Sequence, residues 1–216
     1  MNRLASAGAA LHRQFAGTNS VDEWGMDADT VGLTRFFASL RWHTDVVGAA
    51  HVPPRGPALL IANRRSFDTT PVLVATTLGG ACGRPVRFAG VPDLAPLGPF
   101  LRRSGGVIAR PDEIAGLLRA GEVAAVWCTS PLLDPRRVGP APLPYLEVAV
   151  ELHVPVVPVA VNAAPLGRRA RVEAAPPIDT SKARGPLATT ELAELVRRTI
   201  QRLTDEVNPL ARLPFL

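Results

Sequence analysis

Uninterrupted apolar runs of strand length constrain the fold of this chain more than any other feature of its sequence. The runs cover residues 57–62, 123–127 and 156–161. A strand buried on both faces is apolar throughout, whereas a half-exposed strand alternates apolar and polar residues. Segments with the apolar spacing of helices stand between the runs. We therefore expect an α/β fold with a mostly parallel central sheet that is flanked by helices on both faces.

Other signals complete the expected order of elements. Further strands are expected at the start of 43–53, at 86–89 and at 106–109. Helices are expected over 30–42, 71–78, 93–103, 111–119, 145–152 and 187–207. Pro71 suits the first turn of a helix, and Gly79 and Gly80 are expected to end that helix. The proline-rich segment 131–144 is expected to be a long loop that covers or approaches a site.

Length and composition favour one domain. The 216 residues are 47% hydrophobic and 20% charged, as in globular proteins. We expect an N-terminal helical segment over residues 1–41 and an α/β domain over 42–216. No run of 18 apolar residues is present, so no membrane-spanning helix is expected. Cys82 and Cys128 lie far apart without a CxxC partner, so we expect no disulfide, no metal site and a cytoplasmic location.

The net charge of +5 rests on arginine, and Lys182 is the only lysine. A GC-rich genome is the simplest explanation of this bias. Three arginine clusters could nevertheless contact phosphates or the anionic inner face of the plasma membrane: Arg102-Arg103, Arg136-Arg137 and Arg168-Arg169-Ala170-Arg171. Nucleic acid is not expected as a partner, because the basic pairs are scattered and no aromatic residues are interleaved with them. Phe36 and Phe37 fit a core position better than a lipid interface, which stays the alternative.

Two predicted turns follow strands at the same edge of the sheet. One contains Asn63, Arg64 and Arg65, and the other contains residues 128–130. Ligands of such sheets bind beyond the carboxyl ends of the strands. This edge is therefore the candidate site.

Five collinear segments resemble the glycerolipid acyltransferase family, which includes the lysophosphatidic acid and glycerol-3-phosphate acyltransferases. The resemblance covers about residues 42–203, and its segments are 42–63, 87–110, 121–130, 154–161 and 175–181. It implies an α/β fold that transfers a fatty acyl group from acyl-CoA or acyl carrier protein to a lysophospholipid or another hydroxyl. It also implies that Arg110, at the end of Gly-Val-Ile-Ala-Arg, holds the phosphate of the substrate.

The catalytic motifs of the family are not preserved in this chain. The first family motif is a histidine followed after four residues by an aspartate, and these positions are Arg64 and Thr69 here. The Pro-Glu-Gly of the third motif is replaced by Cys128, Thr129 and Ser130. An arginine has no acceptor atom and a pKa above about 12, so it cannot act as a general base. The loss of general-base assistance costs about 10²–10⁴-fold in rate.

Another group would have to supply the missing base. Asp68 lies one residue before Thr69, which holds the aspartate position of the motif. The neighbouring arginines are expected to lower the pKa of Asp68 and so to weaken it as a base. A helix N-cap or an ion pair with Arg64 or Arg65 is the alternative role of this carboxylate. The four histidines offer no Ser-His-Asp triad: His12 lies in the N-terminal segment, His51 in a turn and His153 beside a strand, while His43 begins one.

We expect a positively charged site in place of a catalytic one. The candidate ligand-binding residues are Arg64, Arg65, Ser66, Arg110, Thr129 and Ser130. The arginines could converge on a phosphate or on the phosphates of coenzyme A, or Arg64 and Arg65 could instead pair with acidic neighbours. The leading hypothesis is a membrane-peripheral protein with an acyltransferase fold that binds acyl-CoA, a phospholipid or a protein partner without catalysis. The alternatives are an active acyltransferase with Asp68 as a displaced base, and a pure protein-interaction module.

Overall fold

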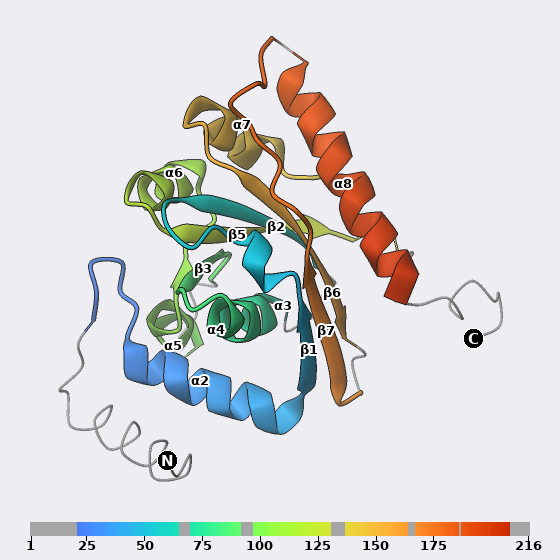
Figure 1. Cartoon of the computed structure of the whole chain (residues 1–216). Coiled ribbons are helices and arrows are strands. Elements are labelled where there is room, and N and C mark those ends of the chain that lie inside the picture. The colour runs from blue at the N-terminus through green and yellow to red at the C-terminus, as the bar shows by residue number, and fades with distance from the viewer. Residues whose placement is uncertain are drawn as a thin grey trace.

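A seven-stranded sheet forms the centre of the molecule. The computed structural model describes residues 21–64, 70–91, 97–130, 137–163, 167–185 and 187–207. Within these ranges the sheet has the strand order β1-β7-β6-β2-β5-β3-β4 (Figure 1). The strands are β1 (His43–Val47), β2 (Ala58–Arg64), β3 (Val86–Ala89), β4 (Gly106–Val107), β5 (Val123–Thr129), β6 (Val156–Ala163) and β7 (Arg169–Ala174). The expected α/β class is confirmed.

The strands run in two directions. Among the described pairings only β6 with β7 is antiparallel, and the other five are parallel. Strands β1 and β7 therefore run opposite to β2, β3, β4, β5 and β6. As a result, β1 and β7 begin at the edge where the other strands end.

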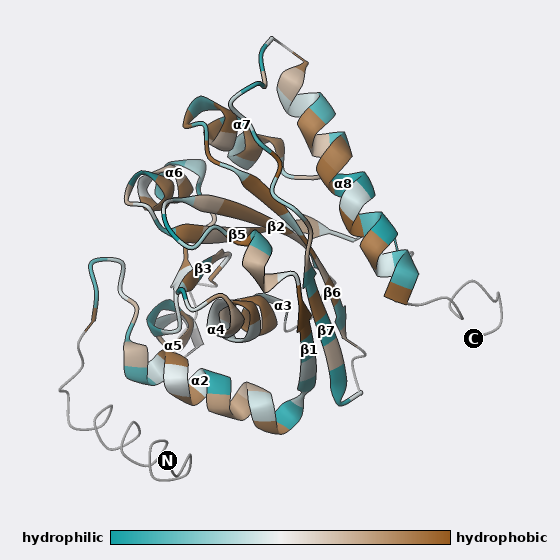
Figure 2. Ribbon diagram, in the orientation of Figure 1, coloured by the Kyte–Doolittle hydropathy of each residue, from teal (hydrophilic) through white to brown (hydrophobic). Residues whose placement is uncertain are grey.

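Helices cover both faces of the sheet (Figure 1). They are α2 (Ala28–Arg41), η1 (Ala49–His51), α3 (Thr70–Leu73), η2 (Val74–Leu78), α4 (Gly79–Ala81), α5 (Leu97–Arg103), α6 (Pro111–Arg119), α7 (Leu143–Glu151) and α8 (Ala188–Val207). One core cluster joins Leu59 and Ile61 of β2 to α6, α7 and α8. The other joins Leu60 of β2 to α3, η2 and strand β3. Figure 2 shows that β2 and β5 are hydrophobic along most of their length, as strands buried on both faces require.

The helix expected to end at Gly79 and Gly80 continues through both glycines. Helix α3 runs into the π-helical turn η2 and then into α4, and Cys82 is the C-cap. A Cβ atom at Gly79 would lie 3.0 Å from the carbonyl oxygen of Arg84. Gly79 therefore allows a close approach between the helix and the segment after it. The prediction of a helix end at these glycines was wrong.

Strand β7 was not predicted from the sequence. Its buried residues Ala170, Val172 and Ala174 alternate with Arg169, Arg171 and Glu173. The charged residues made this short alternation difficult to recognise in the sequence. In the structure Arg171 pairs with Glu173 and with Asp45 of β1. Part of the arginine cluster 168–171 thus belongs to the sheet. In the expected loop 131–144, residues 131–136 lie outside the described ranges and α7 begins at Leu143.

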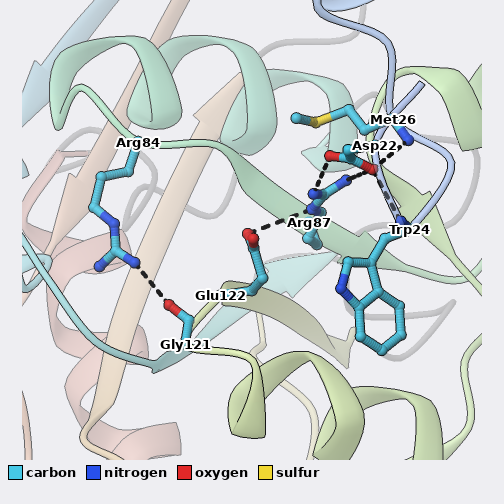
Figure 3. A network of polar contacts seen from close by, with 7 residues as sticks. All are labelled: Asp22, Trp24, Met26, Arg84, Arg87, Gly121 and Glu122. Carbon is cyan, nitrogen blue, oxygen red and sulfur yellow. Dashed lines mark hydrogen bonds and ion pairs between the residues drawn. The ribbon is translucent and has the colours of Figure 1, made fainter. Parts of the chain in front are cut away.

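Two arginines, the buried Arg87 and the half-buried Arg84, close the edge of the sheet where β2, β3 and β5 begin (Figure 3). Arg87 of β3 is 2% exposed and pairs with Asp22 and with Glu122. Arg84 donates to the carbonyl oxygens of Pro53, Gly56 and Gly121 at 2.7–2.9 Å. These contacts tie the segment before α2 to the sheet. The division between residues 41 and 42 stays a prediction, and residues 1–20 lie outside the described ranges.

Candidate functional site

The described ranges contain four of the eight candidate residues. Arg64, Arg110, Thr129 and Ser130 are described, and all four lie at or just beyond the carboxyl ends of strands. The other four lie outside the described ranges: Arg65, Ser66, Asp68 and Thr69.

Arg64 and Thr129 are neighbours at the ends of β2 and β5. They are register partners in this parallel pair, as Ala62 and Trp127 are two residues earlier. Ala62 and Trp127 belong to the core cluster on the side of α3. Because side chains alternate along a strand, Arg64 and Thr129 lie on that same side. Thr129 is exposed and Arg64 is half-buried.

The side chain of Asn63 holds the end of β2 against β6. The backbone pairing of these strands ends at Ala62 and Val159. Beyond that point Asn63 donates to the carbonyl oxygen of Val161 at 2.9 Å and accepts from the amide of Val161 at 2.7 Å. Asn63 is 5% exposed, so both hydrogen bonds are buried. The amide side chain continues the pairing and fixes the strand end that carries Arg64.

The guanidinium of Arg64 reaches the end of β3. A Cβ atom at Gly90, the residue after β3, would lie 3.4 Å from Nη1 of Arg64 and 4.0 Å from Nε1 of Trp127. Strand β5 stands between β2 and β3 in the sheet. The Arg64 side chain therefore crosses the end of β5 and carries its charge toward β4.

Arg110 lies three residues beyond β4 at this same edge. It is exposed and is the N-cap residue of α6, with Pro111 at the first helical position. The backbone amide of Gly90 donates to the carbonyl oxygen of Val107, the last residue of β4, at 3.0 Å. The residue beside the Arg64 guanidinium is thus bonded directly to the strand that leads to Arg110.

Ser130 and Cys128 belong to the other side of β5. Cys128 is fully buried in the core cluster of α6, α7 and α8, and burial raises its pKa to about 12. The nearby charge of Arg197 opposes this shift only partly. A thiol with this pKa is not a nucleophile at neutral pH. Ser130 is 7% exposed, and its amide donates to the carbonyl oxygen of Arg64 at 2.9 Å.

The segment after residue 136 packs on this buried side. A Cβ atom at Gly139 would overlap the carbonyl oxygen of Thr129, so only glycine fits there. The amide of Val138 donates to Oε1 of Gln201 on α8 at 2.8 Å. Sequence reasoning named Asn63 only as part of a turn and did not single out Gly139, because the roles of both depend on neighbours that are distant in sequence.

The described histidines lie elsewhere in the fold. His51 contacts the carbonyl oxygen of Ala174 through Nδ1 at 2.8 Å. His43 is exposed at the start of β1, three strands from β2. His153 is exposed as well and has a positive φ of 54°. In the described ranges no group of three or more His, Cys, Asp or Glu residues is arranged to hold a metal ion.

Helix α2 presents apolar side chains to solvent. Phe37 and Leu40 are each 54% exposed, so the core interpretation was wrong for Phe37. Phe36 is half-buried, and its ring contacts that of Phe37. None of the described helices is both long and apolar enough to cross a membrane.

Comparisons with known proteins agree with this architecture. No protein-family model matches the chain. Uncharacterized proteins of Mycobacterium tuberculosis and Mycobacterium bovis are 30% identical over 135 residues, which is 57% of this chain and 38% of theirs. A Mycobacterium leprae protein, also uncharacterized, is 29% identical over 135 residues and 37% of its length. The match thus spans well under half of these relatives.

A solved structure is similar over nearly the whole chain. The crystal structure of the 1-acyl-sn-glycerophosphate (LPA) acyltransferase PlsC from Thermotoga maritima has a TM-score of 0.64 and 19% identity. The match covers 93% of this chain and 88% of that chain. The chain therefore has an acyltransferase-like α/β fold.

Proposed function

We propose that this protein binds a phosphate-bearing acyl ligand, acyl-CoA or a lysophospholipid, and does not transfer the acyl group. The observation that carries this proposal is Arg64 at the carboxyl end of β2, where the family resemblance expects a catalytic histidine. A guanidinium keeps its proton at any physiological pH, so it can bind an anion but cannot activate a hydroxyl. The likeness to an LPA acyltransferase supports the acyl and phosphate chemistry of the ligand.

The neighbours of Arg64 suit an anionic group. Thr129 replaces the acidic residue expected from the third motif, so a carboxylate is exchanged for a neutral hydroxyl donor beside Arg64. Arg110 adds a second cation at the same edge, and this one is exposed. Arginine binds phosphate through paired hydrogen bonds, which are stronger than those between neutral groups.

Binding is tested with two arginines at opposite ends of α6. Arg110 is the N-cap residue, and Arg119 lies in the last turn and is also exposed. We expect Arg110→Gln to weaken binding of palmitoyl-CoA by about tenfold, as the loss of one charge-assisted hydrogen bond predicts. Arg119→Gln removes the same charge and should leave the dissociation constant unchanged. Calorimetry measures the dissociation constants of both variants. If both variants bind equally weakly, the loss reflects a lower overall positive charge and not a contact of Arg110.

Turnover is tested with a variant that restores the family pattern. We expect no ester product from the unaltered protein with palmitoyl-CoA and oleoyl-lysophosphatidic acid. The triple variant Arg64→His, Thr69→Asp, Thr129→Glu restores the base, its partner and the acidic residue. Product formed by the unaltered protein would contradict the inactive assignment. Loss of that product in Asp68→Asn would then support a displaced base.

The same protein is proposed to contact an anionic membrane through α2. Phe37 and Leu40 form an exposed apolar surface beside the half-buried Phe36, and Arg41 and Arg168 lie next to it. Arg168 donates to the carbonyl oxygen of Leu40 at 2.9 Å. Helix α2 ends two residues before β1, at the edge of the sheet where β2 also ends. Aromatic and arginine side chains together favour the interface of an anionic bilayer.

Vesicle flotation tests this contact. We expect the protein to float with vesicles of phosphatidylglycerol and phosphatidylcholine and to bind pure phosphatidylcholine less. Phe37→Ser with Leu40→Ser should abolish flotation, because both apolar contacts are lost. Leu195→Ser on α8, where leucine is 47% exposed, is the control and should float normally. An unaltered protein that carries no lipid and ignores both vesicles would favour the protein-interaction module.

A further inference from the structure

We propose that helix α2 is a strap that opens to admit the acyl chain of the ligand and then closes over it. This inference rests on the proposed binding of an acyl ligand and adds the route by which the chain enters. Helix α2 packs against α3, η2 and α5, on the side of the sheet where Arg64 and Thr129 lie. The core cluster on this side contains apolar side chains that an acyl chain can contact, among them Leu73 and Leu78.

Few apolar contacts hold α2 in place. Four of its 14 residues are buried, and two of these four, Thr30 and Thr34, are polar. The other two, Leu33 and Ala38, belong to neither of the two core clusters of the described residues. Helix α8 by contrast contributes five apolar side chains to the core cluster on its side. Elements with few buried apolar contacts open locally at a lower free energy than the core does.

The buried contact between α2 and the end of α5 lacks one hydrogen. Oγ1 of Thr34 lies 2.8 Å from the carbonyl oxygen of Thr30 and 3.0 Å from Oγ of Ser104. Oγ of Ser104 also lies 3.0 Å from the carbonyl oxygen of Phe100. Each hydroxyl has a single hydrogen, so the two hydroxyls can make only two of these three hydrogen bonds at once. Thr34 is 6% and Ser104 is 5% exposed, so the missing bond is a cost of the closed arrangement.

A second buried group is incompletely paired at the start of α2. Asp27 is the N-cap residue, and its Oδ2 accepts from the amide of Thr30 at 3.0 Å and from the hydroxyl of Thr30. Oδ1 of Asp27 is buried as well, and within the described ranges it has no hydrogen-bond partner. A buried carboxylate oxygen without a donor costs free energy that is recovered when water reaches it. Opening of α2 therefore relieves a cost at two places.

The chain is tied to the sheet on both sides of this contact. Before α2, Asp22 pairs with the buried Arg87 of β3. At the other end, Arg168 donates to the carbonyl oxygen of Leu40 at 2.9 Å, and β1 follows directly. These ties hold the two ends of α2 while its middle separates from α5. The helix therefore opens as a strap and not as a free end.

Hydrogen exchange of the unaltered protein tests the opening itself. We expect the amides of α2 to exchange about 100-fold faster than those of β2 and β5, because exchange in α2 needs only local opening. Mass spectrometry of peptides measures the rates, and no ligand is needed. If α2 exchanges as slowly as β2 and β5, it opens only when the whole protein unfolds, and the strap is overturned.

Thr34→Val tests the missing hydrogen, with Thr204→Val as the matched control. Thr204 on α8 is also 6% exposed, and its hydroxyl donates to the carbonyl oxygen of Ile200 at 2.9 Å. Valine at position 34 leaves the hydrogen of Ser104 to Phe100 alone, so we expect exchange in α2 to slow by about threefold. Thr204→Val should not slow exchange in α8. Faster exchange in α2 of Thr34→Val would overturn the strap.

A disulfide tests whether the acyl chain needs the opening. Thr34→Cys with Ser104→Cys places sulfur atoms where oxygens lie 3.0 Å apart, which suits an S–S bond of about 2.05 Å. In a Cys82→Ala background we expect the oxidised protein to bind palmitoyl-CoA about tenfold more slowly than the reduced protein. Coenzyme A, which has no acyl chain, should bind both forms at the same rate. Stopped-flow fluorescence measures these rates.

The outcomes separate the strap from the proposed function. If the unaltered protein does not bind palmitoyl-CoA, the proposed function fails, and the exchange rates alone then show whether α2 opens. Equal rates of palmitoyl-CoA binding in the oxidised and reduced forms overturn the strap. Slower binding of palmitoyl-CoA alone supports it. If the two cysteines do not oxidise, bound palmitoyl-CoA must slow exchange in α2, and unchanged exchange overturns the strap.

Discussion

Cys128 lies in the apolar core at the carboxyl end of β5, and its burial decides its chemistry. The pKa of its thiol is raised to about 12 by burial, so only the unreactive protonated form exists near neutral pH. Cys82 at the end of α4 is half-buried and lies nearer the surface. The same residue type therefore differs in reactivity within one chain.

A thiol reagent can measure this difference. We expect an aromatic disulfide reagent at pH 8 to modify Cys82 in the native protein while Cys128 stays unmodified. In denaturing urea both cysteines should react, because the thiolate of Cys128 becomes solvated. Peptide mass spectrometry identifies the modified residue. Rapid modification of Cys128 in the folded protein would contradict its burial.

The permanent charge of Arg64 makes a second prediction at the residue scale. An Arg64→His variant should bind palmitoyl-CoA more weakly than the unaltered protein as pH rises through about 6.5, where histidine loses its charge. The ratio of the two dissociation constants cancels the titration of the ligand phosphates. We expect this ratio to grow between pH 6 and pH 8, measured by calorimetry. A constant ratio would mean that charge at this position does not bind the ligand.

The adjacent glycines Gly79 and Gly80 of α4 face different neighbours, so a side chain would be tolerated differently at each position. Gly79 faces the backbone of Arg84, and a Cβ there would also lie 3.4 Å from Val86. Gly80 is exposed and faces the flexible end of Arg35, with 3.3 Å between a Cβ and Cζ. The backbone of Arg84 cannot yield, because the Arg84 side chain is bonded to three carbonyl groups.

Alanine at the two positions should have opposite effects on stability. Gly80→Ala should raise the free energy of unfolding by about 0.5–1 kcal/mol, because alanine favours the helix. Gly79→Ala should lower it by about 1–2 kcal/mol, because overpacking against backbone outweighs that gain. Urea unfolding measures the free energy of unfolding of both variants, and each variant is the control for the other. Stabilisation by both would refute the close approach at Gly79.

Different contacts stabilise the two edges of the sheet at which the strands begin and end. Where β2, β3 and β5 begin, Arg87 and Arg84 join the segment before α2 and several loops to the sheet (Figure 3). Where these strands end, Asn63 joins β2 to β6, and Arg64 and Thr129 are register partners of β2 and β5. One edge is closed by ion pairs and hydrogen bonds of two arginines, and the other carries the candidate site.

Asp22→Asn tests the closed edge. Burial raises the pKa of Asp22, but hydrogen bonds from Arg87, Met26 and Trp24 and the charge of Arg87 lower it below its usual 3.8 overall. A carboxyl with a lowered pKa stabilises the fold above its unfolded pKa, and the contribution is lost as pH falls through the folded pKa. We expect Asp22→Asn to lower the free energy of unfolding by about 2 kcal/mol at pH 7.

The pH dependence of the stability lost in Asp22→Asn shows whether the loss arises from the charge of Asp22. Asp22 is 38% exposed, so solvent screening keeps its contribution below the about 3–5 kcal/mol of a fully buried pair. The difference between the two proteins in urea unfolding should be constant from pH 5 to pH 8 and shrink below pH 4. A difference that persists undiminished at pH 3 would mean that the asparagine perturbs packing and not charge.

Elements with a strong local pattern could be predicted from the sequence. Helix 111–119 and strand 86–89 were predicted to the residue, and the last helix within one. Strand β7 was missed because every second residue of its first five is charged. At the candidate site, the apolar runs and the polar turns after them were enough to predict that Arg64 and Thr129 lie at the same edge of the sheet. Trp127 had no local signal, because its hydrogen bond to Ala89 joins β5 to the end of β3, which is distant in the chain.

The sequence alone determined the α/β class, and it led to the prediction of a site at one edge of the sheet with Arg64 where a base is expected. These follow from local periodicity and from the chemistry of one side chain, which need no knowledge of distant contacts. The tertiary structure alone decided the strand order, the side of the sheet on which Arg64 and Thr129 both lie, and the exposure of Phe37. Each of these depends on which segments pack together, and a parallel sheet joins segments that are far apart in the chain.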